Sequence, residues 1–233
     1  MLFRSLDEEE YVLDKLRPDL EKRLRDKGFV TLFWGDSGWV RFFSRTEATR
    51  PADFKTMKIL VTASGSAKQM QIMQALGYRP VPLDMTDALI QLKTGGVDAV
   101  PTLPLLALTG QYCSVTKHMV EVPWAALVGA AVVTERTWNS IPPALREPML
   151  QAARDAGRRI QQASRQENAQ AVEMMQKKWG LQVHQLTPAL EAEWRQFAES
   201  IYPKIRGTMV PEAMFDRARQ HAAEYRAAHK GGQ

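Results

Sequence analysis

The side chains that most often carry catalysis or bind metals are few in this sequence and widely scattered. There is no glycine-rich phosphate loop with its lysine, no zinc motif and no serine nucleophile elbow. The histidines match no metal-ligand spacing, so we interpret them as surface or capping residues: His118, His184, His221 and His229. The pattern therefore predicts no catalytic residue, no metal ligand and no cofactor.

Two other reactive groups also favour a structural interpretation. Cys113 is the only cysteine, so an internal disulfide is impossible, and its neighbours Tyr112 and Ser114 do not activate a thiol. Asp84 and Asp87 lie close together near an expected helix start, where the helix dipole alone favours acids. A general acid–base pair is the weaker interpretation. An enzyme stays open as one alternative, which turnover of a screened metabolite would support.

The stretch 54–104 holds two β-α units in series and positions any site that the chain has. An apolar run over 58–61 ends at small polar residues and is followed by helical spacing over 69–76. A second helix ends at Gly95-Gly96, after which a strand begins over 97–100. Strands joined through helices imply a parallel sheet, and ligands bind beyond the carboxyl ends of such strands. Here those ends are residues 62–66 and 101–104.

The flanking segments predict a mixed α/β domain. We expect a helix over 7–27, divided at Pro18, and a strand over 29–43 that is interrupted at 35–38. Further on, the run 125–133 is typical of a fully buried strand. Three more helices are expected, over 142–179, over 187–202 and from 211 onward.

The bulk properties exclude several classes of protein. The net charge is +5, but basic residues alternate with acids along helical segments such as 17–27 and 154–165, so we predict no nucleic-acid partner. No window approaches the roughly 18 apolar residues that cross a bilayer. The first residues lack the basic start and apolar core of a secretory signal.

Short motifs between residues 51 and 153 carry a family resemblance through their order. The motifs are Pro51-Ala52-Asp53-Phe54-Lys55, Met57-Lys58-Ile59, Leu76-Gly77, Pro80-Val81-Pro82, Ala88-Leu89, Leu92-Lys93-Thr94-Gly95, Val97-Asp98-Ala99 and Pro104, then Trp138, Ile141-Pro142, Leu145-Arg146 and Ala152-Ala153. In this order the chain resembles the solute-binding subunit of TRAP transporters, the DctP-like family. The resemblance implies a two-lobed periplasmic-binding-protein-like fold with a long helix backing both lobes. Lobe I would comprise 1–36 and 125–165, and lobe II 37–124 and 166–233.

The resemblance also implies a function and a location. A periplasmic receptor of this kind binds a small-molecule solute between its lobes and delivers it to TRAP membrane subunits, as a monomer or weak dimer, without catalysis. Such receptors begin with an export signal and further β-α units, so we expect this chain to be truncated, with the N-terminal part of lobe I missing. A cytoplasmic two-lobe effector-sensing domain is the alternative, and a DNA-binding domain encoded upstream would favour it.

The resemblance places the ligand contacts residue by residue. The arginine that often holds a carboxylate falls on Leu60, and a second basic position falls near Trp39 and Val40, beside Arg41. An aromatic contact falls on Met85 and a polar one on Thr102. The predicted ligand-binding residues are Trp34, Trp39, Leu60, Met85, Thr102 and Trp124. Tryptophan and methionine are more often core residues than ligand contacts, and for Trp39 and Trp124 the two interpretations stay open. Because this set contains no cation, we expect a neutral, apolar or aromatic solute.

Overall fold

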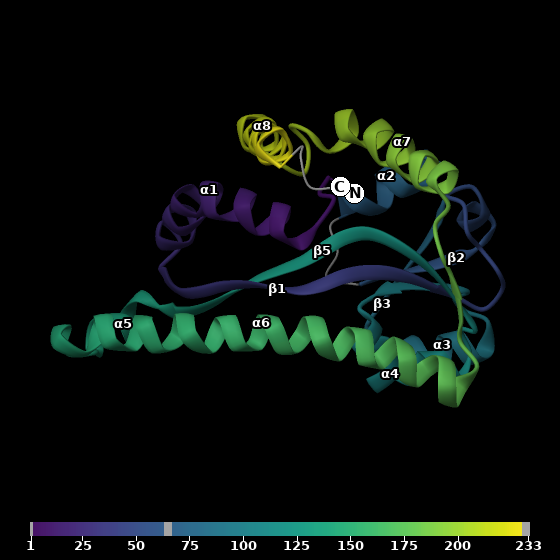
Figure 1. Cartoon of the computed structure of the whole chain (residues 1–233), viewed down its shortest axis with the longest axis horizontal. Coiled ribbons are helices and arrows are strands. Elements are labelled where there is room, and N and C mark those ends of the chain that lie inside the picture. Colours follow the sequence, from purple (N-terminus) through teal and green to yellow (C-terminus); the bar gives the residue numbers. More distant parts are fainter. Residues whose placement is uncertain (1, 63–66, 230–233) are drawn as a thin grey trace. The chain divides into compact units, whose positions relative to one another are not determined.

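The computed structural model describes residues 2–62 and 67–229 and shows a mixed α/β chain (Figure 1). The helices are α1 (Leu6–Arg25), α2 (Ala67–Ala75), α3 (Ala88–Thr94), α4 (Pro104–Thr109), α5 (Glu135–Ser140), α6 (Pro143–Trp179), α7 (Pro188–Ile205) and α8 (Glu212–Ala228). The strands are β1 (Phe29–Ser44), β2 (Lys58–Thr62), β3 (Arg79–Leu83), β4 (Ala99–Thr102), β5 (His118–Thr134) and β6 (Gln182–His184). The expected order of elements is confirmed.

The chain packs as two compact units. The larger unit comprises residues 39–125 and 167–212, and the smaller unit comprises residues 2–38, 126–166 and the chain from 213 onward. Strands β1 and β5 and helix α6 contribute residues to both units. The sequence-based division assigned all of 166–233 to one lobe. Residues 213–229 pack with the smaller unit, in which α8 places its apolar side against α1. The lobe boundaries stay a prediction.

The larger unit is built on a sheet with the strand order β3-β2-β4-β1-β5-β6. Strand β2 pairs in parallel with β3 and with β4, as the two β-α units predict. Strand β1 pairs antiparallel with β4, and β5 pairs in parallel with the short edge strand β6.

Both faces of this sheet are buried, and neighbouring strand residues enter opposite cores. Ile59 belongs to the core under α7, whereas Leu60 belongs to the core under α3, α4 and the end of α6. Phe42 and Phe43 divide in the same way. Figure 1 shows α7 on one side of these strands, with α3 and α4 on the other. We call these layers the α7 core and the α3 core.

The α7 core is an aromatic cluster centred on Trp194, which is 1% exposed. Its ring stacks on Phe42 at a centroid distance of 5.4 Å and meets Trp124 edge-on at 5.7 Å. The indole nitrogen donates a 2.8 Å hydrogen bond to the carbonyl oxygen of Thr49, so the one polar atom of this side chain is satisfied. Trp194 is therefore a packing residue.

The smaller unit corrects two local expectations. Helix α1 runs through Pro18 without a break, because Val12 and Leu16 pack on Ala222 of α8 and this packing outweighs the lost backbone donor. Figure 1 shows α1 and α8 side by side. Strand β1 is also continuous through 35–38, where the predicted interruption is wrong. Asp36 accepts a 2.9 Å hydrogen bond from the backbone nitrogen of Gly38, which satisfies this stretch locally.

An ion-pair network fixes the middle of β1 within the smaller unit. The side chain of Asp36 is fully buried, and its carboxylate accepts hydrogen bonds from Arg165 and Gln161 of α6, each at 2.5 Å. Glu9 of α1 is only 3% exposed. Burial, followed by repulsion from Asp36 and Glu10, raises the pKa of Glu9 to about 7, although Arg165 acts in the opposite direction.

The raised pKa of Glu9 makes stability depend on pH. Glu9 keeps its proton in the folded chain up to about pH 7, whereas in the unfolded chain it loses the proton near pH 4.5. The free energy of unfolding should therefore fall as the pH rises from 4.5 to 7. Glu9→Gln should remove that loss, gaining on the order of 3 kcal/mol over the wild type above pH 7 and little at pH 5. Urea denaturation of both proteins between pH 5 and 8 measures the difference.

Glu167→Gln is the matched control, because Glu167 is exposed on α6. Its difference from the wild type should not change with pH. A Glu9→Gln difference that is equally flat from pH 5 to 8 would contradict the assigned pKa.

Candidate functional site

The carboxyl ends of the parallel strands mark the candidate site of the larger unit. Strands β2 and β4 end at Thr62 and Thr102, the edge at which sheets of this type place their ligands. Residues 63–66, which the sequence also assigned to this edge, lie outside the described residues. Thr102 is 5% exposed and pairs with Arg41 of β1 across the antiparallel ladder.

Strand alternation brings Arg41 to the same face as the α3 core. Arg41 lies two residues before Phe43, which belongs to that core, and Thr102 lies two residues after Val100, which also belongs to it. A guanidinium group is therefore placed at the end of an otherwise apolar layer. Its position follows from the same period of two that buries Phe43.

The guanidinium of Arg41 is buried and incompletely paired. The side chain is 15% exposed, and its nearest carboxylate is Glu121, with 4.0 Å between Nη2 and Oε1. Nη1 is buried and has no hydrogen-bond partner among the described residues. Burial lowers the pKa of Arg41 and Glu121 partly offsets this, but arginine keeps its proton. A buried donor without an acceptor costs about 1–3 kcal/mol, so this nitrogen is well suited to pair with an anion.

The surroundings of this edge are held by polar contacts to the backbone. Asn168 of α6 accepts a 3.0 Å hydrogen bond from the backbone nitrogen of Leu105, which ties the start of α4 to α6. The hydroxyl of Tyr112 donates a 3.2 Å hydrogen bond to the carbonyl oxygen of Met85 and fixes the turn before α3. Met85 is half-buried against the α3 core. These contacts fix the start of α4 and the turn before α3 beside the α3 core.

The structure brings some of the predicted site residues together and separates others. Leu60 (2% exposed), Met85 and Thr102 belong to the α3 side of the sheet, and Trp39 alternates with Arg41 on that side. Trp124 packs instead in the α7 core, where it contacts Phe42 and Trp194.

Trp34 and Arg41 complete the comparison with the sequence. Trp34 belongs to the smaller unit, and its indole nitrogen is buried with no partner in the described part of the chain. Arg41 was noted only as a neighbour of the predicted basic position. The available signal was the alternation of Arg41 with Phe43 in an apolar strand.

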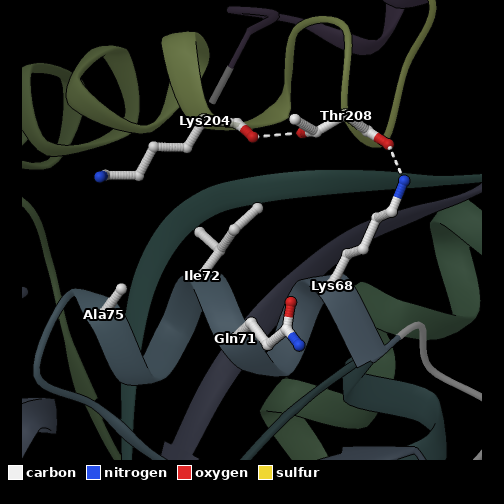
Figure 2. Close-up of a pocket in the computed structure, with 6 residues that line it drawn as sticks. All are labelled: Lys68, Gln71, Ile72, Ala75, Lys204 and Thr208. Carbon is white, nitrogen blue, oxygen red and sulfur yellow. Dashed lines mark hydrogen bonds between the residues drawn. The ribbon is translucent and has the colours of Figure 1, made fainter.

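A hollow of about 370 Å³ lies between α2 and the end of α7. It is lined by Lys68, Gln71, Ile72, Ala75, Lys204 and Thr208. Figure 2 shows Lys68 reaching Thr208, whose carbonyl oxygen accepts its 2.8 Å hydrogen bond, while Lys204 extends away from it. Only Ile72 is even partly buried. Both ammonium groups face water, so this hollow lacks the desolvated polar groups with which solute sites select their ligands.

Other chemistry has no counterpart in the described residues. They contain no cluster of three or more His, Cys, Asp or Glu side chains suited to a metal ion. No helix among them has the length and apolar character needed to span a membrane.

The fold and this edge define a class of solute-binding α/β proteins. A TRAP periplasmic solute-binding protein from Shewanella oneidensis with bound succinate aligns with a TM-score of 0.85 at 19% identity, covering 95% of this chain and 72% of that one. A TRAP periplasmic solute-binding protein from Ralstonia eutropha H16 with bound (S)-2-acetolactate aligns with a TM-score of 0.83 at 25% identity. This alignment covers 96% of this chain and 72% of that one. The predicted fold class is confirmed.

The family follows from the sequence itself. Residues 2–207 match the DctP family, described as bacterial extracellular solute-binding protein, family 7, and the chain belongs to this family of binding proteins rather than enzymes. The C4-dicarboxylate-binding periplasmic protein DctP of Rhodobacter capsulatus is 24% identical over 186 residues, which are 80% of this chain and 55% of the relative. An uncharacterised protein of Haemophilus influenzae is 26% identical over 190 residues, which are 78% of this chain and 55% of that protein. The chain thus spans about half the length of the curated relatives it matches. The predicted resemblance to a periplasmic receptor family is confirmed.

The incomplete pairing of Arg41 predicts an unusual effect on stability. Arg41→Met removes a buried charge of which one nitrogen has no acceptor, and it keeps an apolar stem of similar length. Without solute, the variant should be as stable as the wild type or about 1 kcal/mol more stable in urea denaturation. Arg50→Met is the control, because Arg50 forms an exposed pair with Glu193 and should change little. A loss of more than about 2 kcal/mol in Arg41→Met would show that Arg41 holds the fold together instead.

Proposed function

We propose that this chain is the solute-binding part of a TRAP-type transporter, located in the periplasm, and that it delivers a small organic acid to membrane subunits. Membership of the DctP family supports the receptor role. Similar structures support the solute class, because the ligands named for them, succinate and (S)-2-acetolactate, are carboxylates.

The observation that carries the proposal is the unpaired nitrogen of Arg41. A carboxylate can accept two parallel hydrogen bonds from a guanidinium, and such charge-assisted bonds are roughly twice as strong as neutral ones. Nη1 has no acceptor among the described residues, and Glu121 at 4.0 Å from Nη2 is too far for a good hydrogen bond. A solute carboxylate would satisfy both donors.

A neutral apolar solute, which the sequence pattern favoured, receives no support from the comparisons. That expectation rested on a set of contacts without a cation, and it left out Arg41. A neutral hydrocarbon would leave the buried donor of Arg41 unpaired, at a cost of about 1–3 kcal/mol. Trp39, Leu60, Met85 and Thr102, which lie on the α3 side of the sheet, stay as proposed contacts of the solute, whereas Trp124 packs in the α7 core on the other face.

Calorimetric titration with small acids and their amides tests this function. We expect at least one acid to bind, its uncharged amide to bind at least ten-fold more weakly, and Arg41→Met to lose the acid by a similar factor. Arg50→Met should bind like the wild type. Amides that bind as tightly as the acids would contradict an organic-acid receptor.

A further inference from the structure

We infer that the solute of this site is a monocarboxylate with an apolar remainder, and that dicarboxylates are disfavoured. The inference rests on the proposed function and narrows its solute class. It follows from the number of charges and the kind of surface at the carboxyl end of β4.

The first argument is the supply of cations on this face of the larger unit. Strands β1, β2 and β4 carry two basic residues, Arg41 and Lys58. By strand alternation, both lie on the side of the α3 core. Lys58 begins β2 at the opposite end, and its ammonium donates to the carbonyl oxygen of Gly95. Arg41 is therefore the one strand-borne cation at the ligand edge.

The second argument is that the charge of Arg41 is already partly balanced. Oε1 of Glu121 lies 4.0 Å from Nη2, while Oε2 of Glu121 accepts a 2.6 Å hydrogen bond from Gln185. This second bond holds the Glu121 carboxylate in place. One solute carboxylate can use the free donors of Arg41, but a second negative charge would meet Glu121, and the described residues of β1, β2 and β4 offer it no further cation at this edge.

The third argument is the surface that the rest of the solute would meet. Leu60 of β2 is 2% exposed within the α3 core, and Leu83 and Met85 are partly buried against the same core. These side chains offer no hydrogen bond to a second carboxylate, whose burial without partners costs several kcal/mol. They suit alkyl or aryl groups, which gain from burial.

Matched acids test the inference on the full chain. Butanoate is compared with succinate, and benzoate with terephthalate, because each pair differs only in the second carboxylate. We expect each monocarboxylate to bind at least ten-fold more tightly than its dicarboxylate in calorimetric titration at pH 7.5.

Met85→Arg supplies the missing second cation at a half-buried position, so a disrupted core is not expected. It should raise succinate affinity relative to butanoate at least ten-fold. Leu106→Arg is the matched control, because Leu106 of α4 is 44% exposed and the same charge there should leave the ratio unchanged.

The outcomes separate this inference from the proposed function. Succinate that binds as tightly as butanoate to the wild type, and is lost in Arg41→Met, would overturn the monocarboxylate inference and leave the receptor function intact. Binding of neither acid class, or acid binding that ignores Arg41→Met, would overturn both. If Met85→Arg is unfolded by circular dichroism, the wild-type ratios alone decide.

Discussion

The sheet of the larger unit is buried on both faces, and this constraint governs every side chain that its strands carry. Neighbouring residues such as Ile59 and Leu60 belong to different cores, so each strand position commits its side chain to one layer. A polar group in such a strand must find a partner or stand at the edge of the layer. Arg41 lies at the edge of the layer, opposite the end of β4, where a bound ligand could pair with its unpaired nitrogen.

The smaller unit shows what a satisfied buried charge looks like in this chain. Asp36 accepts hydrogen bonds from Arg165, Gln161 and the backbone of Gly38, so its carboxylate is fully surrounded by donors. Among the described residues, Arg41 has one carboxylate partner, Glu121, at 4.0 Å. Both are charges within β1, yet one is a closed network and the other is open. This contrast supports a structural role for Asp36 and a binding role for Arg41.

Much of the fold followed from local patterns in the sequence. Glycines after helical spacing and apolar runs ended by small residues located the two β-α units, because turn chemistry and periodicity are local properties. Pro18 and the 35–38 stretch were misjudged, because the packing of α1 against α8 and the hydrogen bonds of Asp36 with Gln161 and Arg165 join segments far apart in the sequence. Local propensity could not reveal either.

The site was less predictable than the fold. Trp124 alternates with Val120 and Val122, but only the position of α7 shows that this face is an aromatic core. Arg41 was passed over because the expected basic position fell beside it. Its place opposite Thr102 and the lack of a described acceptor for Nη1 are visible only in the three-dimensional structure. Spacing in the sequence therefore pointed to the edge of the sheet at which Arg41 lies, but not to Arg41 itself.

A crystal structure of the chain with benzoate tests the central claim most directly. The account predicts a carboxylate oxygen within about 2.7–3.2 Å of Nη1 of Arg41, with the ring against Leu60 and Met85. A carboxylate bound elsewhere, for example between Lys68 and Lys204, with Nη1 of Arg41 still unpaired, would contradict it.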